Sequence, residues 1–348
     1  MKKLKTLLRH FRITLGKLIL DKRKKEYTVT DILPIKSILF LRQDGKIGDY
    51  IVSSFVFREL KKDNPNIKIG VVCSDDTFFS RNTNIDQIYR VKKKNIFDYI
   101  RVALQIRKEK YDALIDPTIF LRNRDLLLIR LINAKINLGY QKQDYQLFNL
   151  NMNISGQHFA DVYANALRLL GIENINQQYD VPCDTQSEKN ISEFLQQYKT
   201  IPFIAINCFG AASSRKLNHT NITALLTQLT ALCPQKTIAL LTYPQVTAQL
   251  QSIAAQYDNI IIYQDTKTIF DSIAIIRQAE WVISPDTSIV HIASGLNKKL
   301  IAFYQDKQKD PINFAHWHPN NQAETHILFY PDNINQIQIA DISADWFK

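Results

Sequence analysis

Three short segments place small residues beside charged or hydroxyl side chains, each directly after a run that predicts a β-strand. They are Arg42–Asp49 (RQDGKIGD), Asn207–Lys216 (NCFGAASSRK) and Ser284–His291 (SPDTSIVH). In parallel α/β sheets, turns of this kind lie at the carboxyl ends of the strands, where ligands bind. Each segment is therefore a candidate for binding or catalysis.

The first segment offers carboxylates. Asp49 follows Gly45 and Gly48 and begins an apolar-periodic run that predicts a helix. A carboxylate there can act as a general base toward a hydroxyl group. It can equally do no more than favour the positive end of the helix, worth about 0.3–1 kcal/mol. Asp44 is a rival base and is also explained as an ordinary turn residue.

The second segment suits a diphosphate. Its backbone N–H groups and the hydroxyls of Ser213 and Ser214 can donate hydrogen bonds, and Lys216 supplies positive charge. A polar surface loop without a ligand explains the same composition equally well.

The third segment also suits an anion. Pro285 ends a buried strand, and either Asp286 or Thr287 can cap the helix that follows. The free N–H groups at such a helix start attract anions. His291 lies one turn further along, on the same side as Thr287. An ordinary capped helix with a packed histidine remains the alternative.

Strand and helix patterns alternate along the 348 residues, and this alternation predicts α/β domains with parallel sheets. It is interrupted over residues 178–200 and then restarts. We therefore expect an N-terminal arm (1–30), a first domain (31–180), a linker (181–200) and a second domain (201–348). Residues Asp49–Lys62 are expected to form one helix. The expected strands are Ser37–Arg42, Ile67–Cys73, Ala113–Asp116, Lys135–Gly139, Phe203–Asn207, Thr237–Thr242, Ile260–Tyr263, Trp281–Ser284 and Leu300–Tyr304.

The net charge of +11 is concentrated at the N-terminus. Residues 1–25 contain ten Lys or Arg and a single acid, Asp21, whereas the rest of the chain is nearly neutral. The basic character therefore belongs to an arm and not to a domain face. Because no interleaving of aromatic and basic residues follows, a nucleic-acid-binding protein is disfavoured.

The arm has an amphipathic pattern. Its apolar residues recur at helical spacing, while no apolar run approaches the roughly 20 residues of a membrane span, and charges interrupt any secretory signal. The pattern fits a helix lying on an anionic membrane surface. A helix packed against the protein itself is the alternative. The apolar residues are Leu4, Leu7, Leu8, Phe11, Leu15 and Leu18.

Several cofactor classes lose support. The four cysteines have no metal-ligand or redox spacing, which suits a reducing compartment, and Cys73 and Cys208 lie in apolar runs typical of buried residues. Neither a G-x-G-x-x-G nor a P-loop motif occurs. No clustered carboxylates indicate an obligatory metal ion, so we expect no metal and no cofactor.

The three segments resemble motifs of the bacterial ADP-heptose:lipopolysaccharide heptosyltransferases, glycosyltransferase family 9. Residues Arg42–Asp49 resemble the motif R-x-x-x-x-G-D with an extra spacer, and Gly210–Lys216 resembles G-A-x-x-x-x-K. Residues Asp286–His291 resemble D-T-G-x-x-H, and His158–Gly171 is similar to the helix before the family's linker. The resemblance covers nearly everything after residue 36.

The resemblance implies a GT-B architecture, with two Rossmann-like domains facing a central cleft. It implies inverting transfer of a heptose from ADP-heptose to the inner core of lipopolysaccharide, with Asp49 as catalytic base. The enzyme would work in the cytoplasm, associated through residues 1–25 with the anionic inner face of the inner membrane, on a phosphorylated lipid-linked oligosaccharide. The donor site would comprise Gly210, Ala211, Ser213, Ser214, Lys216, Asp286, Thr287, Ser288 and His291. Candidate acceptor-binding residues are Asp44, Lys46, Arg122 and Arg124.

Two departures from the family pattern affect the donor. Ser288 stands where the family has glycine, and Thr242–Gln245 replaces a turn that usually contains an acid for the donor's ribose. A related glycosyltransferase that uses another nucleotide-sugar is therefore one alternative. A non-catalytic protein that binds sugar nucleotides is the other.

Overall fold

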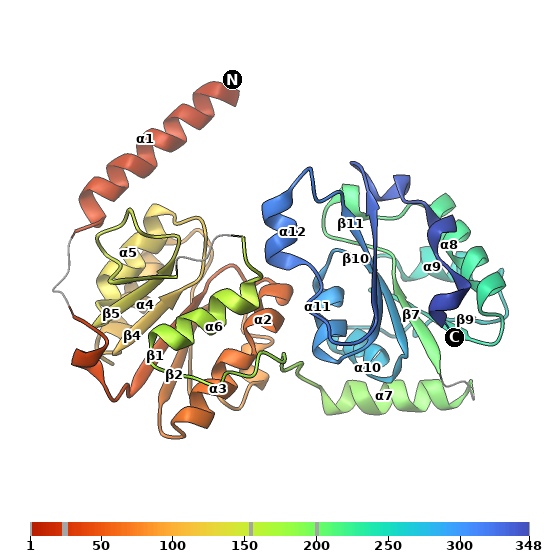
Figure 1. The fold of residues 1–348 in the computed structure, drawn as a ribbon, viewed down its shortest axis with the longest axis horizontal. Helices are drawn as coiled ribbons and strands as arrows, with labels where there is room; N and C mark the ends of the chain where they lie inside the picture. The colour runs from red at the N-terminus through yellow and green to blue at the C-terminus, as the bar shows by residue number, and fades with distance from the viewer. Residues whose placement is uncertain (1, 23–26, 153–155, 199–201, 348) are drawn as a thin grey trace. The chain divides into compact units, whose positions relative to one another are not determined.

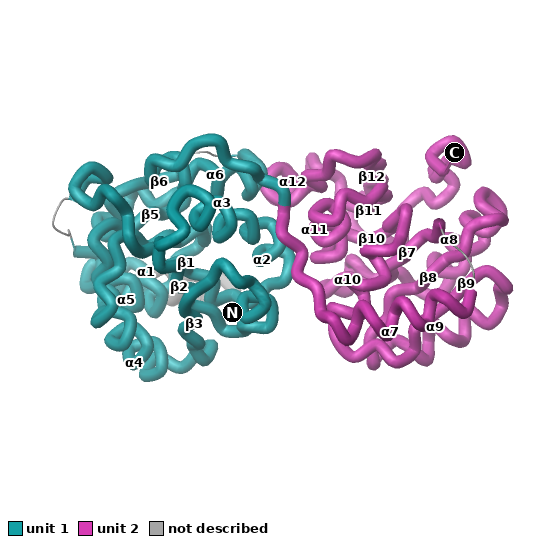
Figure 2. Tube along the Cα trace, turned by 90° about the horizontal axis from the view of Figure 1, so that it is seen from below, with its two compact units in different colours: residues 1–178 teal, residues 179–348 magenta. Residues whose placement is uncertain are grey.

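In the computed structural model of the chain, residues 2–22, 27–152, 156–198 and 202–347 are described, with side chains from residue 11 onward. The chain divides into two compact units, residues 1–178 and 179–348 (Figure 2). The expected boundary at 200/201 lies outside the described residues. No helix in the described ranges is long and apolar enough to cross a membrane.

The first unit is built on a six-stranded sheet in which every pair of neighbours is parallel, in the order β3-β2-β1-β4-β5-β6 (Figure 1). This is the doubly wound order, in which β1 and β4 flank the point where the winding reverses. Its strands are β1 (Ser37–Arg42), β2 (Lys68–Cys73), β3 (Gln87–Arg90), β4 (Ala113–Asp116), β5 (Ile136–Tyr140) and β6 (Leu150–Met152). Its helices are α1 (Lys2–Leu20), α2 (Ile47–Ser53), α3 (Phe55–Asp63), α4 (Ile96–Arg107), α5 (Asn123–Ile132) and α6 (Phe159–Leu169).

Strand β1 shows why both faces of this sheet are covered. All of its residues after Ser37 are buried, so it reads as a continuous apolar run. Leu39 and Leu41 pack with the buried residues of α4 and α5. Phe40 points the other way, with ring centroids 5.5 Å from Phe57 of α3 and 5.9 Å from Tyr163 of α6. The alternation of one strand thus joins two helical layers in a single core.

The expected single helix Asp49–Lys62 is wrong in one respect, because α2 ends at Ser53 and α3 starts at Phe55. The hydroxyl of Ser53 donates to the carbonyl oxygens of Asp49 and Tyr50, and that of Ser54 donates to Ile51. Serine hydroxyls that bond back to helical carbonyls compete with the backbone and bend helices. The break keeps α2 as a short separate helix carrying Asp49.

The second unit repeats the first unit's topology. Its all-parallel sheet has the order β9-β8-β7-β10-β11-β12, so β7 and β10 take the places of β1 and β4. Its strands are β7 (Phe203–Asn207), β8 (Thr237–Leu241), β9 (Ile260–Ile261), β10 (Trp281–Pro285), β11 (Lys299–Gln305) and β12 (Thr325–Tyr330). Its helices are α7 (Thr185–Gln196), α8 (His219–Leu232), α9 (Thr247–Ala254), α10 (Ile269–Gln278), α11 (Ser288–Gly295) and α12 (Pro311–Trp317).

One face of the second sheet is covered by α8, α9 and the C-terminal 3-10 helices, which share a buried core with β7, β10 and β11. On another side, α7 packs against α10. Glu188 of α7 receives a hydrogen bond from Arg277 of α10 at 2.9 Å. The segment expected as a linker therefore contains a helix that clusters with the second unit.

All nine expected strands are present, with ends shifted by no more than two residues, but β3, β6, β12 and α12 were not expected. β3 is a short strand at the sheet edge with one buried residue, and β6 has only three residues. β12, also at an edge, is mostly half-buried. Edge strands lack the continuous apolar run that identifies central strands. Cys73 and Cys208 are buried, as expected.

Candidate active site

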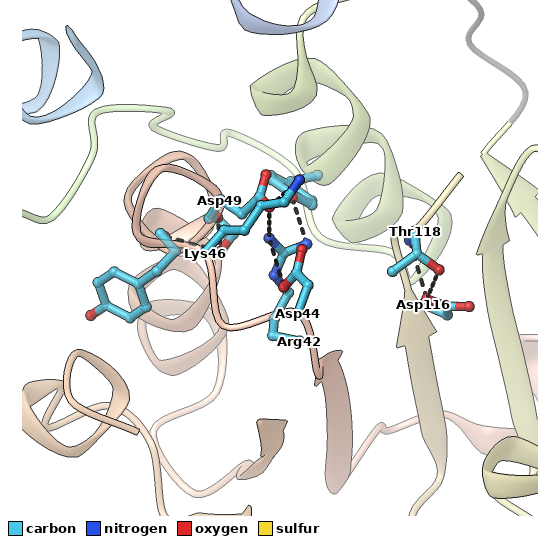
Figure 3. Close-up of polar contacts among 9 residues, drawn as sticks. Arg42, Asp44, Lys46, Asp49, Asp116 and Thr118 are labelled. Carbon is cyan, nitrogen blue, oxygen red and sulfur yellow. Dashed lines mark hydrogen bonds and ion pairs between the residues drawn. The ribbon is translucent and has the colours of Figure 1, made fainter. Parts of the chain in front are cut away.

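In the first unit, charged groups gather where β1 ends. Arg42 is the last residue of β1 and only 3% exposed. Its Nη2 lies 3.1 Å from Oδ2 of Asp49 and 3.7 Å from Oδ1 of Asp44 (Figure 3). Lys46, whose side chain is 71% exposed, reaches Oδ2 of Asp49 at 3.8 Å. The first sequence segment thus gathers its other three charged residues, Arg42, Asp44 and Lys46, around the carboxylate of Asp49.

The surroundings of Asp49 favour the protonated form of its carboxyl group. Burial raises the pKa of Asp49 to about 7; Arg42 opposes this, and the neighbouring Asp44 adds to it. For Asp44, burial acts in the same direction, but Arg42 and the hydrogen bond to Asp49 outweigh it and the pKa falls below its ordinary value. A carboxylate with a pKa near neutrality is suited to accept and release a proton.

The neighbouring strand β4 ends in a second buried carboxylate. Oδ1 of Asp116 accepts hydrogen bonds from the backbone N–H and hydroxyl of Thr118, at 3.1 and 2.7 Å. Lys142, fully buried, donates from Nζ to the carbonyl oxygens of Thr118, Ile119 (3.1 Å) and Tyr140 (2.8 Å). Burial raises the pKa of Asp116 and lowers that of Lys142. This lysine fixes the loop that leaves β4.

Two of the predicted acceptor residues lie at the start of α5. Arg122 is exposed at the N-cap, and its N–H donates to Asp125 at 3.2 Å. Arg124 is only partly exposed, with its guanidinium 5.4 Å from the ring centroid of Tyr99. Burial, with Asp116 adding to it, raises the pKa of Asp125 to about 6. The charged character of this edge therefore extends beyond Asp49.

In the second unit, side-chain hydrogen bonds join the second and third sequence segments. Asn207, which ends β7, donates from Nδ2 to the hydroxyls of Ser284 (3.1 Å) and Thr287 (3.2 Å). The Thr287 hydroxyl in turn accepts from the N–H of Ile289, so Thr287 is the cap of α11. Adjacent strands β7 and β10 thus present the two segments side by side.

The loop after β7 is folded tightly on itself. The N–H of Gly210 donates to the carbonyl of Arg215 at 2.8 Å, and Phe209 pairs with Lys216 in an isolated bridge. A Cβ on Gly210 would lie 2.6 Å from Cβ and 2.9 Å from the backbone oxygen of Arg215. Glycine is therefore required there, and the loop presents Ala211, Ser213 and Lys216 to solvent. Ser214 is half-buried.

Arg215 connects this loop to the third segment. Its Nη1 donates to the carbonyl oxygen of Asp286 at 2.9 Å and to Oδ2 of the same residue at 2.8 Å. Burial raises the pKa of Asp286 and Arg215 opposes this. The sequence indicated Lys216 as the source of charge in this loop, whereas the structure adds Arg215, Asn207 and Ser284 to the site. Asn207 and Ser284 lie near the ends of β7 and β10, and that position is a signal in the sequence. Arg215 lies in the 3-10 helix Ser213–Arg215, and its partner is seen only in the structure.

His291 is placed where the sequence expected it, one turn into α11, but it is only 4% exposed. Its ring centroid lies 5.9 Å from that of Trp317, and Nδ1 has no hydrogen-bond partner among the described residues. Burial, and secondarily His318, lowers the pKa of His291 to about 4. It is therefore a neutral side chain at physiological pH.

The turn Thr242–Gln245 after β8, which departs from the family pattern, is held by hydrogen bonds of threonine hydroxyls. The side chains of Thr242 and Thr247 are hydrogen-bonded at 2.8 Å, and the carbonyl of Tyr243 accepts from the N–H of Thr247 at 3.2 Å. The ring of Tyr243 meets that of Phe209 edge-on, with centroids 6.2 Å apart. An aromatic pair thus stands beside the loop where the family pattern has an acid.

This arrangement can be compared with that of known proteins. A protein of Escherichia coli K12, provisionally named lipopolysaccharide heptosyltransferase 4, is 25% identical over 89% of this chain and 86% of its own length. The glycosyl transferase family 9 structure from Veillonella parvula DSM 2008 superposes with a TM-score of 0.70 and 18% identity, over 93% of this chain and 96% of that one. The Escherichia coli heptosyltransferase WaaC with ADP gives a TM-score of 0.62 and 13% identity, over 89% and 95%.

These superpositions confirm the expected GT-B fold. In addition, residues 99–333, well over half of the chain, match the sequence profile of glycosyltransferase family 9 (heptosyltransferase). The chain therefore belongs to glycosyltransferase family 9, the heptosyltransferases.

Proposed function

We propose that this enzyme transfers a heptose from ADP-heptose to the inner core of lipopolysaccharide with inversion at the anomeric carbon. The observation that carries the proposal is the buried Asp49, whose pKa of about 7 fits a general base. In the reaction, the proton of the acceptor hydroxyl passes to Asp49. The acceptor oxygen bonds to the anomeric carbon, and ADP departs with the electrons of the broken carbon–oxygen bond.

The second unit would bind the donor. The loop Gly210–Lys216, with its exposed Ser213 and Lys216, and the start of α11 at Thr287 and Ser288 offer donors for a diphosphate. These groups would stabilise the charge that develops on the leaving ADP. Arg215 would act through Asp286, with which it forms an ion pair. Neutral His291 would pack under the first turn of α11 and hold it in place. The superposed WaaC structure contains ADP, which supports an ADP-linked donor.

The proposal involves no metal ion, so transfer should proceed unchanged in excess chelator. The direct test is mass spectrometry of the product formed from ADP-heptose and heptose-deficient core. We expect Asp49→Asn to lower kcat by about 10²–10⁴-fold, the usual contribution of a general base. Unchanged transfer in this variant would show that Asp49 is not the base.

Nucleotide preference remains a separate question because of the Thr242–Gln245 turn. Calorimetric titration of the protein with ADP, UDP and GDP distinguishes the alternatives. We expect the tightest binding for ADP; preferential binding of UDP would favour the related glycosyltransferase with another donor. Binding of a nucleotide-sugar with no turnover of any donor would favour the binding-only protein.

We also propose that α1 holds the enzyme on an anionic membrane surface. Where its side chains are described, the helix contacts the first unit around Gly16, which is buried against Asn123; the amide of Asn123 donates to the carbonyl of Arg12 at 2.8 Å. Asp21, after the helix, accepts the N–H groups of Gln146 (3.1 Å) and Leu147 (2.8 Å). Figure 1 shows α1 beside α5.

Of the apolar stripe of α1, the residues whose side chains are described, Phe11, Leu15 and Leu18, are turned away from this contact. Phe11 is 68% and Leu18 74% exposed, with Leu15 and Ile19 also exposed. At 100° per residue, Phe11, Leu15 and Leu18 share a face, and Gly16 lies on the other side. The alternative of an arm packed by its apolar face on the protein is therefore disfavoured. An apolar stripe combined with the basic arm suits an anionic bilayer.

Sedimentation with vesicles tests this second proposal. We expect binding to vesicles containing anionic lipid and loss of binding when residues 1–25 are deleted. The double variant Phe11→Ser/Leu18→Ser keeps every charge and should bind at least tenfold more weakly. Ile312→Ser, at a 63% exposed apolar residue of the second unit, is the matched control. Equal binding of the double variant and wild type would show that charge alone acts.

A further inference from the structure

Arg42 and Asp44 take no part in the proposed reaction, yet both are held against its base. The guanidinium of Arg42 lies between the two carboxyl groups, 3.1 Å from Asp49 and 3.7 Å from Asp44 (Figure 3). We propose that Arg42 and Asp44 are positioning residues that act on Asp49 in opposite senses: the guanidinium aims its carboxylate, and the second carboxylate makes it a stronger proton acceptor. This inference rests on the role proposed for Asp49.

Arg42 has the geometry of a fixed support. It is 3% exposed at the end of a central strand, and its Nη1 donates to the hydroxyl of Tyr163 of α6 at 3.3 Å. Nη2 is the atom that faces Asp49 and Asp44. A planar guanidinium can bridge such partners with its separate N–H groups, whereas a lysine ammonium is a single point of charge. Arg42 thereby ties the short helix α2 to both β1 and α6.

Asp44 opposes the effect of Arg42 on the pKa of Asp49. A buried carboxylate beside a guanidinium alone would stay ionised and would be a weak base. Burial is the largest cause that raises the pKa of Asp49; Arg42 lowers it, and the negative charge of Asp44 raises it again. The groups that face the pair come from every neighbouring element: Lys46 from the same turn acts on Asp49, and Tyr163 of α6 and Asp116 of β4 act on Arg42.

The pH dependence of kcat/KM reports the result, because only ionised Asp49 accepts a proton. In wild type, kcat/KM should rise with pH through about 7. We expect Asp44→Asn to move this acidic limb down by about one pH unit, since a like charge is removed. Arg42→Gln should move it up by about one unit or more. Lys46→Met, at an exposed side chain, should move it up by less.

Orientation is tested by the conservative variant. Arg42→Lys keeps the charge and should keep the acidic limb near its wild-type position, while kcat falls about tenfold or more with KM little changed. Lys62→Met, at a 63% exposed lysine of α3, is the control that should shift neither quantity. A shift of Asp44→Asn in the same direction as Arg42→Gln, or loss of transfer without any shift, would overturn the proposal.

A readout independent of turnover separates this inference from the proposed function. The ¹³C carboxyl resonance of Asp49 can be titrated by NMR in wild type and in folded Asp44→Asn protein. We expect the midpoint to fall by about one unit in the variant. If Asp49→Asn keeps full transfer activity but the midpoint shifts as expected, the role of Asp49 as base is lost while the tuning stands. If the midpoint does not move, the tuning is refuted.

Discussion

The two sheets have the same strand order but carry different chemistry at the same place. In each, the site residues follow the strands that flank the reversal of winding: β1 and β4 in the first unit, β7 and β10 in the second. The first unit buries ionisable groups there, among them Arg42, Asp49 and Asp116. The second places an amide, hydroxyls and an exposed glycine-containing loop there.

The difference fits the division of tasks proposed above, with the base in the first unit and the donor site in the second. Burial moves the pKa of a carboxyl toward neutrality, which a proton acceptor requires. Holding a diphosphate requires many neutral donors and accessible N–H groups, which cost little to expose. The shared topology supplies the location, and the residues after the strands decide which task each unit performs.

The largest difference between the units should appear in the cost of removing a lysine. Lys142→Met removes a fully buried ammonium that binds three carbonyl oxygens and faces Asp116. We expect the free energy of unfolding of the first unit to fall by about 3–5 kcal/mol, since a buried carboxylate and several acceptors lose their partner. Urea unfolding followed by a probe in that unit measures this.

The matched control is Lys216→Met, at an exposed lysine of the second unit. We expect its unfolding free energy to change by less than about 0.5 kcal/mol. Equal effects of the two variants would contradict the distinction between a buried-charge site and an exposed anion loop.

The contributions of Asp49 and His291 to the free energy of unfolding should depend on pH in opposite ways between about pH 4 and 7. The pKa of Asp49 is about 7 in the folded protein and near 3.9 in the unfolded chain, so the folded protein binds this proton more tightly. The stability that Asp49 contributes is therefore lost as pH rises. The pKa of His291 is about 4 in the folded protein and near 6.5 in the unfolded chain, so the folded protein binds this proton less tightly. The stability that neutral His291 contributes is therefore lost as pH falls. The effect is on the order of 4 kcal/mol for Asp49 and 3 kcal/mol for His291.

Hydrogen exchange of core amides, corrected for intrinsic rates, measures each unit separately. Asp49→Asn should flatten the pH dependence of the first unit and raise its stability at pH 7. His291→Phe should flatten that of the second unit. If both wild-type units gained stability with rising pH, the buried Asp49 would have an ordinary pKa and the case for it as base would weaken.

The central strands and the three turns could be predicted because each depends on local signals. β1 and β10 are continuous apolar runs, and Pro285 and Thr287 mark the start of α11 through backbone geometry and capping. The common topology of the two units was predicted only through the family resemblance, which implies two Rossmann-like domains; no internal sequence repeat indicates it. Topology is set by which strands pair, and residues far apart in sequence decide that.

The hydrogen-bond and ion-pair partners within the site could not be predicted from the sequence either. In the sequence Arg215 is simply a basic residue beside Lys216, and only the adjacency of β7 and β10 brings it to Asp286. Lys142 lies in a polar stretch that looks solvated, yet it is fully buried because three carbonyl oxygens surround its ammonium. A charge's burial depends on such tertiary partners, which composition and spacing do not contain.

Gly210→Ala tests the shape of the donor loop. The added Cβ would lie 2.9 Å from the backbone oxygen of Arg215, so the loop must shift. We expect donor affinity to fall about tenfold and stability by about 1–3 kcal/mol. Calorimetric titration with ADP and urea unfolding provide the two measurements. Ala211→Gly, at the next and exposed residue, should change affinity much less; a larger loss there would show that flexibility, not shape, limits binding.

The smallest effect should come from restoring the family's glycine at Ser288. This residue is the first of α11, half-buried, and its backbone N–H points toward the start of the helix whatever its side chain. Ser288→Gly should therefore change ADP affinity by no more than about threefold, or about 0.65 kcal/mol, and should cost a few tenths of a kcal/mol in helix stability. Calorimetry decides this. A gain of more than about tenfold would mean that the serine Cβ holds the phosphate away from α11. The second unit would then be adapted to a donor other than the one the family uses.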